Sequence, residues 1–193
     1  MSRRVDGPGG RVASPAAALA PYLVRPRVEP PLDAGFRPIA VAREAARAAA
    51  SRSRHAAPVT IGLERSGGLV DRREALVIEA GRPGAAATRI LAERLVKAML
   101  WSRGGHRIWV DGPPDLAAHL RRHYGATAVG RFDAATIAAS VYGQPLEVVA
   151  APAAEFPPVK ETGLALGGHL DGCRIGFDLG ASDRKVAAVI DGR

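Results

Sequence analysis

The sequence of 193 residues is long enough for one ordinary domain and a tail, and its hydrophobic fraction of 47% allows a buried core. A single cysteine, Cys173, excludes an internal disulfide framework and a cysteine-rich metal site, and it is typical of a protein of the reducing cytoplasm, where we expect this one. No apolar run approaches the ~20 residues that span a bilayer, so we expect no membrane partner.

Positive charge is concentrated at the start of the chain. The formal net charge is +8, and residues 1–57 hold ten arginines against four acids, a net of +6. A nucleic-acid-binding domain needs a concentrated basic face, because that face must neutralise phosphates. The remainder of the chain carries only +2, so we expect no nucleic-acid partner for the folded part.

The amino-terminal 57 residues read as a tail. Prolines and glycines interrupt every apolar stretch from Met1 to Pro38, which predicts disorder, because no segment there buries enough surface to offset its ordering entropy. Residues 39–50 contain strong helix formers, mostly alanine, and predict a short helix that faces solvent or forms transiently. We therefore assign residues 1–57 to a disordered tail with one short helix.

Residues 58–150 alternate strand and helix patterns. The paired glycines of Arg65-Ser-Gly-Gly68 favour a hairpin turn, and Glu93 and Lys97 lie four apart on the expected solvent face of a helix. Such alternation predicts a mixed-sheet α/β accessory domain. The predicted elements are strands over 59–64, 69–79, 106–110 and 146–150, and helices over 86–101, 115–124 and 133–142.

Two pairs of side chains in this domain have more than one reading. His119 and His123 lie four apart on a predicted helix, a spacing that can bind zinc, but no third ligand lies near in sequence and a solvated helix face is favoured. Trp101 and Trp109 are expected in the core or at a domain contact, since a base-stacking platform would have basic neighbours.

Residues 151–170 are rich in proline and glycine and predict a linker. The segment that follows carries the clearest chemical pattern. An apolar strand ends at Asp178, a turn holds Gly180, Ala181 and Ser182, and a second apolar strand begins at Lys185. Residues 171–193 therefore predict a β-hairpin with functional groups at its turn.

Each group at this turn suits the terminal phosphates of a nucleotide. Small residues at a bend let backbone N–H groups approach an anion closely. Ser182 adds a hydroxyl donor, Lys185 adds a cation, and the Asp178 carboxylate can hold a hydrated Mg²⁺ through oxygen. The alternative is an ordinary hairpin turn, but four matched positions favour the phosphate site.

The order Asp-x-Gly-x-Ser-x-x-Lys resembles the first phosphate motif of the ATPase superfamily of actin, heat-shock chaperones and sugar kinases. The wider stretch from Gly167 to Lys185 is similar to the start of the catalytic region of ROK-type repressors and sugar kinases, which usually have two glycines and a threonine where this chain has Gly-Ala-Ser. The resemblance covers about the last tenth of the chain. It implies a metal-side carboxylate at Asp178, a phosphate loop at Gly180, Ala181 and Ser182, and a phosphate contact at Lys185.

This resemblance also implies fold, cofactors and partners. We expect residues 171–193 to be the first hairpin of an actin-like, ribonuclease H-like lobe, with ATP and Mg²⁺ as cofactors and a sugar as substrate. A working kinase of this type needs two lobes and a catalytic acid, so we expect this chain to be an inactive amino-terminal portion. An activator-type ATPase and a non-enzymatic α/β interaction module are the alternatives. A homo-oligomer is compatible with the sequence, which does not determine the oligomeric state.

The first and last hairpins also resemble each other. Residues 61–79 align with residues 175–191 when two residues are gapped, and both read as strand, acid, small turn and strand. Residues 58–150 are therefore either a degenerate copy of the ATPase layer or similar to it by chance, and the sequence supports the two readings about equally.

Overall fold

The computed structural model describes residues 15–161 and 168–193, and the chain divides into two units, 1–161 and 162–193. Part of the predicted disordered tail, residues 1–14, lies outside the described residues. No helix in the described ranges is long and apolar enough to cross a membrane.

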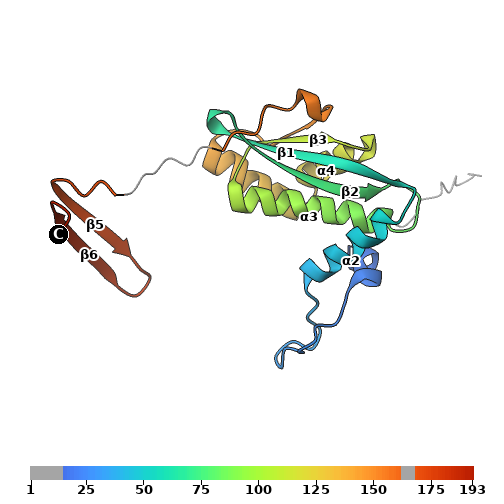
Figure 1. Cartoon of the computed structure of the whole chain (residues 1–193), viewed down its shortest axis with the longest axis horizontal. Helices are drawn as coiled ribbons and strands as arrows, with labels where there is room; N and C mark the ends of the chain where they lie inside the picture. The colour runs from blue at the N-terminus through green and yellow to red at the C-terminus, as the bar shows by residue number, and fades with distance from the viewer. Residues whose placement is uncertain (1–14, 162–167) are drawn as a thin grey trace, which may run out of the picture. The chain divides into compact units, whose positions relative to one another are not determined.

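The first unit is built on a four-stranded mixed sheet in the order β2-β1-β3-β4 (Figure 1). β1 pairs antiparallel with both β2 and β3, and β3 pairs parallel with β4. The mixed α/β architecture predicted from the sequence is confirmed. The strands are β1 (Ala56–Arg65), β2 (Leu69–Ile78), β3 (Arg107–Asp111) and β4 (Glu147–Ala150), and a short 3-10 turn, η2 (Ser66–Gly68), joins the first two.

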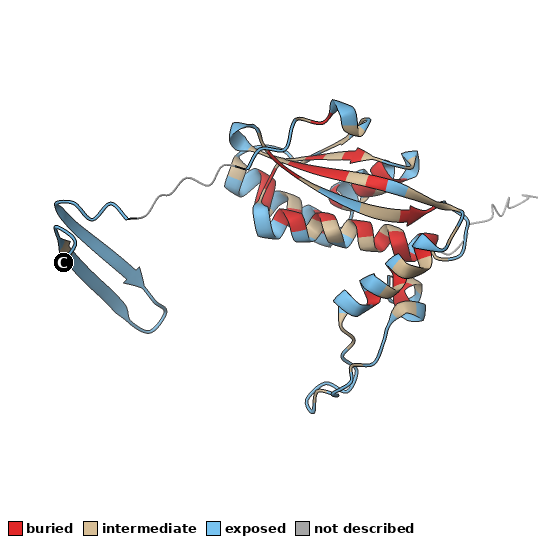
Figure 2. Ribbon diagram, viewed as in Figure 1, coloured by how far each residue is buried: buried red, intermediate tan, exposed pale blue. Residues whose placement is uncertain are grey.

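Helices cover one face of this sheet and enclose the core (Figure 2). Val59, Ile61 and Leu63 alternate along β1, as period-two burial requires, and they pack with Leu100 and Leu116 of the helix layer. The helices of this layer are α3 (Ala85–Arg103), α4 (Pro114–Ala126), α5 (Ala128–Asp133) and the π-helix η3 (Ala134–Val141). The predicted helix over 133–142 corresponds to η3, and α5 extends the helical segment back to Ala128, where Thr127 caps α5 by accepting a hydrogen bond from the Gly130 N–H.

Residues 15–22 and 39–51 of the amino-terminal segment pack against this domain. Its elements are α1 (Pro15–Leu19), η1 (Ala20–Tyr22) and α2 (Ile39–Ser51). The expected helix over 39–50 is present, but Ala42, Ala46 and Ala50 are fully buried, so one side faces protein and not solvent. Leu19 is also buried, against Ala87 and Ile90 of α3. Alanine has no bulk to signal a core position in the sequence, yet it allows close approach between helices.

Residues 151–161, which include the short helix η4 (Ala153–Glu155), cover part of the outer face of the sheet. Phe156 is buried and packs on Trp109 and beneath the guanidinium of Arg72, whose Nη2 donates to the carbonyls of Phe156 and Pro157. Gly62 makes room for this ring, since a Cβ there would lie 3.1 Å from it. This part of the predicted linker over 151–170 is therefore docked on the domain.

The second unit is described by itself. It consists of an antiparallel hairpin, β5 (Cys173–Leu179) and β6 (Arg184–Ile190), as the sequence predicts. In the first unit the equivalent hairpin is followed by α3 and then by β3, which runs antiparallel to β1. The described second unit contains only its hairpin, so the repeat remains a hypothesis supported by two hairpins alone.

Candidate functional site

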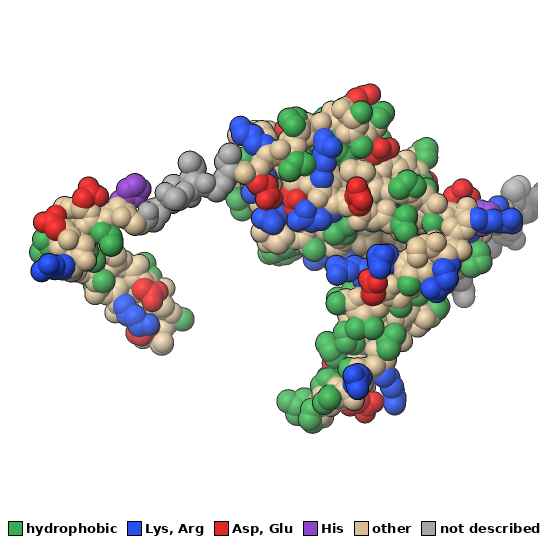
Figure 3. Space-filling model, in the orientation of Figure 1, with side chains coloured by type: hydrophobic (Ala, Val, Ile, Leu, Met, Phe, Trp, Pro, Cys, Tyr) green, Lys and Arg blue, Asp and Glu red, His purple; other side chains and the backbone are tan. Residues whose placement is uncertain are grey.

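The hairpin register brings the predicted site residues together at the turn. Asp178 of β5 is directly opposite Lys185 of β6, so their side chains lie on the same face. The Lys185 Nζ lies 3.7 Å from Asp178 Oδ2. Figure 3 shows acidic and basic side chains side by side at the loop end of this hairpin. The carboxylate and the ammonium of the predicted phosphate motif are therefore adjacent.

Gly180 is required by the close approach of the turn to itself. A Cβ at this position would lie 2.7 Å from Asp183 Oδ1 and 3.0 Å from the Asp183 carbonyl oxygen. The carboxylate of Asp183 thus folds back across the glycine, and its Oδ2 lies 3.6 Å from Lys185 Nζ. Asp183 has no predicted role from the sequence, because it occupies an unspecified position inside the Asp-x-Gly-x-Ser-x-x-Lys motif.

Ala181 and Ser182 form the tip of the turn. Within residues 168–193 and the rest of the described chain, neither of their backbone N–H groups nor the Ser182 hydroxyl donates a hydrogen bond. Both residues are exposed. These three donors are free to meet an external acceptor, as the predicted phosphate loop requires.

The opposite face of the hairpin is apolar. Period-two alternation places Ile175, Phe177 and Leu179 together with Val186 on that face, and each is exposed by 62% or more. Every residue of β5 and all but Val189 of β6 are exposed. A two-stranded hairpin is only marginally stable in water, so this face requires a covering surface.

The donor set at the turn fits a metal-bound phosphate better than a protein-held metal ion. Among the described residues no three His, Cys, Asp or Glu side chains are arranged to hold a metal. Mg²⁺ is usually held by one or two carboxylates together with substrate phosphates and water. Asp178 and Asp183, both near Lys185, supply carboxylates of this kind.

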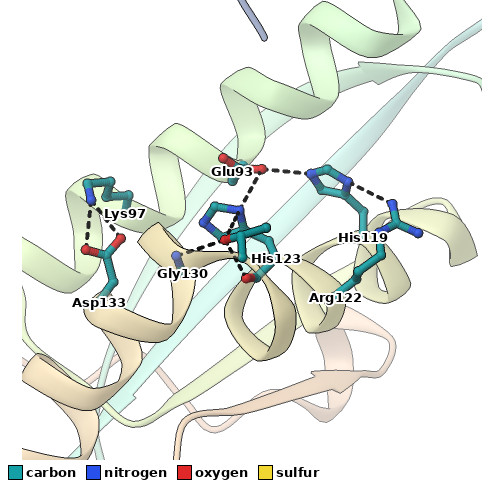
Figure 4. Close-up of polar contacts among 8 residues, drawn as sticks. Glu93, Lys97, His119, Arg122, His123, Gly130 and Asp133 are labelled. Atoms are coloured by element: carbon teal, nitrogen blue, oxygen red, sulfur yellow. Dashed lines mark hydrogen bonds and ion pairs between the residues drawn. The ribbon is translucent and has the colours of Figure 1, made fainter. Parts of the chain in front are cut away.

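A second polar cluster lies between α3, α4 and α5 in the first unit (Figure 4). Glu93 Oε2 lies 2.9 Å from His119 Nε2 and 3.3 Å from His123 Nδ1. The two histidines predicted on a solvated helix face instead point at one carboxylate on a neighbouring helix. The third polar partner that the sequence could not place is therefore Glu93.

Lys97 of the same helix forms an ion pair with a residue of α5. Its Nζ lies 2.8 and 2.7 Å from the two carboxylate oxygens of Asp133, which is fully buried and also accepts from Trp101 Nε1 at 2.9 Å. Glu93 and Lys97, expected on a solvent face of α3, therefore both contact side chains of neighbouring helices. Trp101 is half exposed and stacks on Phe132, whereas the other predicted core tryptophan, Trp109, packs on Phe156.

Burial and neighbouring charge shift three pKa values in the Glu93 cluster. Burial lowers the pKa of His123, and this effect exceeds the opposing attraction of Glu93. Burial alone would raise the pKa of Glu93, but the hydrogen bond from His119 and the charges of both histidines and Arg94 together lower it. Burial raises the pKa of Tyr124, whose hydroxyl has no partner among the described residues.

The histidine and the glutamate predict a pH-dependent stability. Below the ordinary His pKa of 6.5, the unfolded chain protonates position 123 more than the folded chain does, and below 4.5 the same holds for Glu93. Stability should therefore be constant above about pH 7 and fall as the pH is lowered. Denaturant midpoints measured from pH 8 to 4 check this result.

A variant pair assigns the pH effect to its source. His123→Gln should flatten the change between pH 7 and 5, while His169→Gln, at an exposed position in the second unit, should leave it intact. If the denaturant midpoint of His123→Gln falls with pH as steeply as that of the wild-type chain, this histidine is not the cause.

The comparisons with known proteins do not identify a family. Neither a protein-family model, nor a curated protein, nor a solved structure matches this chain.

Proposed function

We propose that the 178–185 turn binds the terminal phosphates of ATP, and that this chain is the amino-terminal portion of a ROK-like ATP-dependent carbohydrate kinase. The observation that supports this proposal is the presence of four kinds of group within one exposed turn: the adjacent Asp178 carboxylate and Lys185 ammonium, the unbonded N–H groups of Ala181 and Ser182, and the free Ser182 hydroxyl.

Each group has a separate task in this proposal. The N–H groups of Ala181 and Ser182 and the Ser182 hydroxyl donate to phosphate oxygens, and Lys185 neutralises their charge. Asp178 would hold the Mg²⁺ that accompanies ATP, and the ion supplies further charge neutralisation. Phosphoryl transfer depends mainly on such positioning and electrostatic stabilisation. Gly180 allows the turn to fold tightly enough to present these groups.

The apolar face of the hairpin supports the view that the turn belongs to a larger lobe. Ile175, Phe177 and Leu179 are exposed together, and a layer packed on them would complete the nucleotide-binding unit. The turn contacts phosphates and not the acceptor, so an activator-type ATPase is the enzymatic rival. A longer polypeptide containing this chain would separate the two, because a kinase releases ADP only in proportion to sugar phosphate formed.

The binding step is testable on the 193-residue chain. We expect MgATP or magnesium pyrophosphate at millimolar concentration to shift the NMR amide signals of residues 180–185 and not those of the other turn, Ser66–Gly68. Because the first unit has its own core, no rise in its melting temperature should accompany this binding.

Lys185→Met should weaken the affinity for magnesium pyrophosphate, measured from these amide shifts, by about fivefold, which is the effect of removing one charge close to a phosphate in water. Arg174→Met is the matched control, since Arg174 lies on the same face of β5 but away from the turn. An absence of shifts at 180–185 in the wild-type chain would leave the interaction module as the better reading, supported by the exposed Trp101–Phe132 stack.

A further inference from the structure

The turn contains a carboxylate beside Gly180 and Lys185, two residues of the proposed phosphate site. Asp183 Oδ1 lies over Gly180, and Asp183 Oδ2 is 3.6 Å from the ammonium of Lys185. Lys185 therefore lies between two carboxylates, those of Asp178 and Asp183. Since these three charges sum to −1, this face of the turn carries no net positive charge with which to attract a phosphate. The next cation, Arg184, is opposite Leu179 and so belongs to the other face.

We propose that the Asp183 carboxylate, which lies over Gly180 and near Lys185, repels an approaching phosphate and so makes phosphate binding dependent on a divalent cation. This inference rests on the proposed function and specifies its ligand as a metal-bound di- or triphosphate. A metal-free polyphosphate meets two carboxylates and one ammonium and is repelled. The Asp178 and Asp183 carboxylates would hold the Mg²⁺ that accompanies the phosphate, and Lys185 would then be free to contact the phosphate.

Asp183 acts here as a specificity-determining residue. Its contact with Lys185 is exposed, with 59% of the Asp183 side chain accessible, so it can open without disturbing a core. Gly180 is the reason that the carboxylate can fold over the turn, because a Cβ would exclude it. The combination of this glycine with Asp183 therefore sets the charge that an incoming phosphate meets.

The test compares pyrophosphate with and without magnesium. Amide shifts of Ala181, Ser182 and Lys185 in the 193-residue chain are followed against pyrophosphate, once with EDTA and once with excess Mg²⁺. The wild-type chain should prefer the magnesium complex. Asp183→Asn should tighten binding of metal-free pyrophosphate by about fivefold, which is the effect of removing one charge near 4 Å in water. The difference in affinity between magnesium pyrophosphate and metal-free pyrophosphate should therefore be smaller for Asp183→Asn than for the wild-type chain.

Asp171→Asn is the charge-matched control, since Asp171 is 86% exposed and pairs with Arg174 away from the turn. It should leave both affinities unchanged. An Asp183→Asn chain that keeps the wild-type preference overturns this inference alone, because the proposed phosphate site still functions. A wild-type chain that responds to neither form of pyrophosphate overturns the proposed function, and this inference with it.

Discussion

Replacing Lys97 by methionine should destabilise the first unit by about 3 kcal/mol, because the substitution leaves a fully buried carboxylate without its cation. Asp133 would keep only the hydrogen bond from Trp101 Nε1. The urea midpoint of the first unit, followed by circular dichroism, measures the loss. Because Lys97 is itself partly exposed, the loss should fall at the lower end of values for buried pairs.

Two variants test the cause of this loss. Arg94→Met removes an exposed cation from the same helix that forms no salt bridge within the described residues and acts on Glu93 only through space, so it should change stability by less than about 0.5 kcal/mol. The double variant Lys97→Met/Asp133→Leu should recover most of the loss, since an apolar pair of similar size tolerates the buried position. A double variant less stable than Lys97→Met would contradict an unpaired charge as the cause.

The second large effect is expected at Gly130. This glycine lies in the first turn of α5, close to the end of α4, and a Cβ there would overlap the carbonyl oxygen of His123. That atom belongs to the backbone and cannot rotate away. Gly130→Ala should therefore cost about 3 kcal/mol or more, and it should also disturb the hydrogen bond from the Gly130 N–H to Thr127 Oγ1.

Gly125 provides the matched control, because a Cβ there would meet nothing within 4 Å and the residue lies inside α4. Gly125→Ala should stabilise the unit by about 0.5–1 kcal/mol, the difference in helix propensity between the two residues. If the two substitutions change stability in opposite directions, the loss at Gly130 is due to the steric contact and not to helix propensity. Equal effects would refute the proposed contact with His123.

Hydrophobic periodicity predicted the strands and helices of the core, but it did not predict the docking of the flanking segments. The alternation in β1 and the apolar spacing of α3 are strong local signals, and both elements lie within two or three residues of their predicted bounds. The docking of α2 was not predicted, because its buried positions are alanines. Phe156 was assigned to a linker for a related reason: its partners, Arg72 and Trp109, are distant in sequence.

The candidate site was predicted from spacing because its groups lie within eight consecutive residues. A hairpin converts that spacing into proximity, and Asp178 and Lys185 meet as a register pair. Asp183 was missed, since its role depends on the path of its side chain over Gly180. The Glu93 cluster was missed as well, because it joins two helices through contacts about 26 residues apart along the chain.

The hairpin also affects the tendency of this polypeptide to self-associate in solution. Within the described residues β5 and β6 pair only with each other, so each presents an outer edge to any other extended chain. An aliphatic and aromatic surface next to such edges favours strand-to-strand self-association at high protein concentration. Preparations of the 193-residue chain should accordingly be handled dilute, and a charged residue in place of Phe177 is the most direct way to improve solubility without altering the turn.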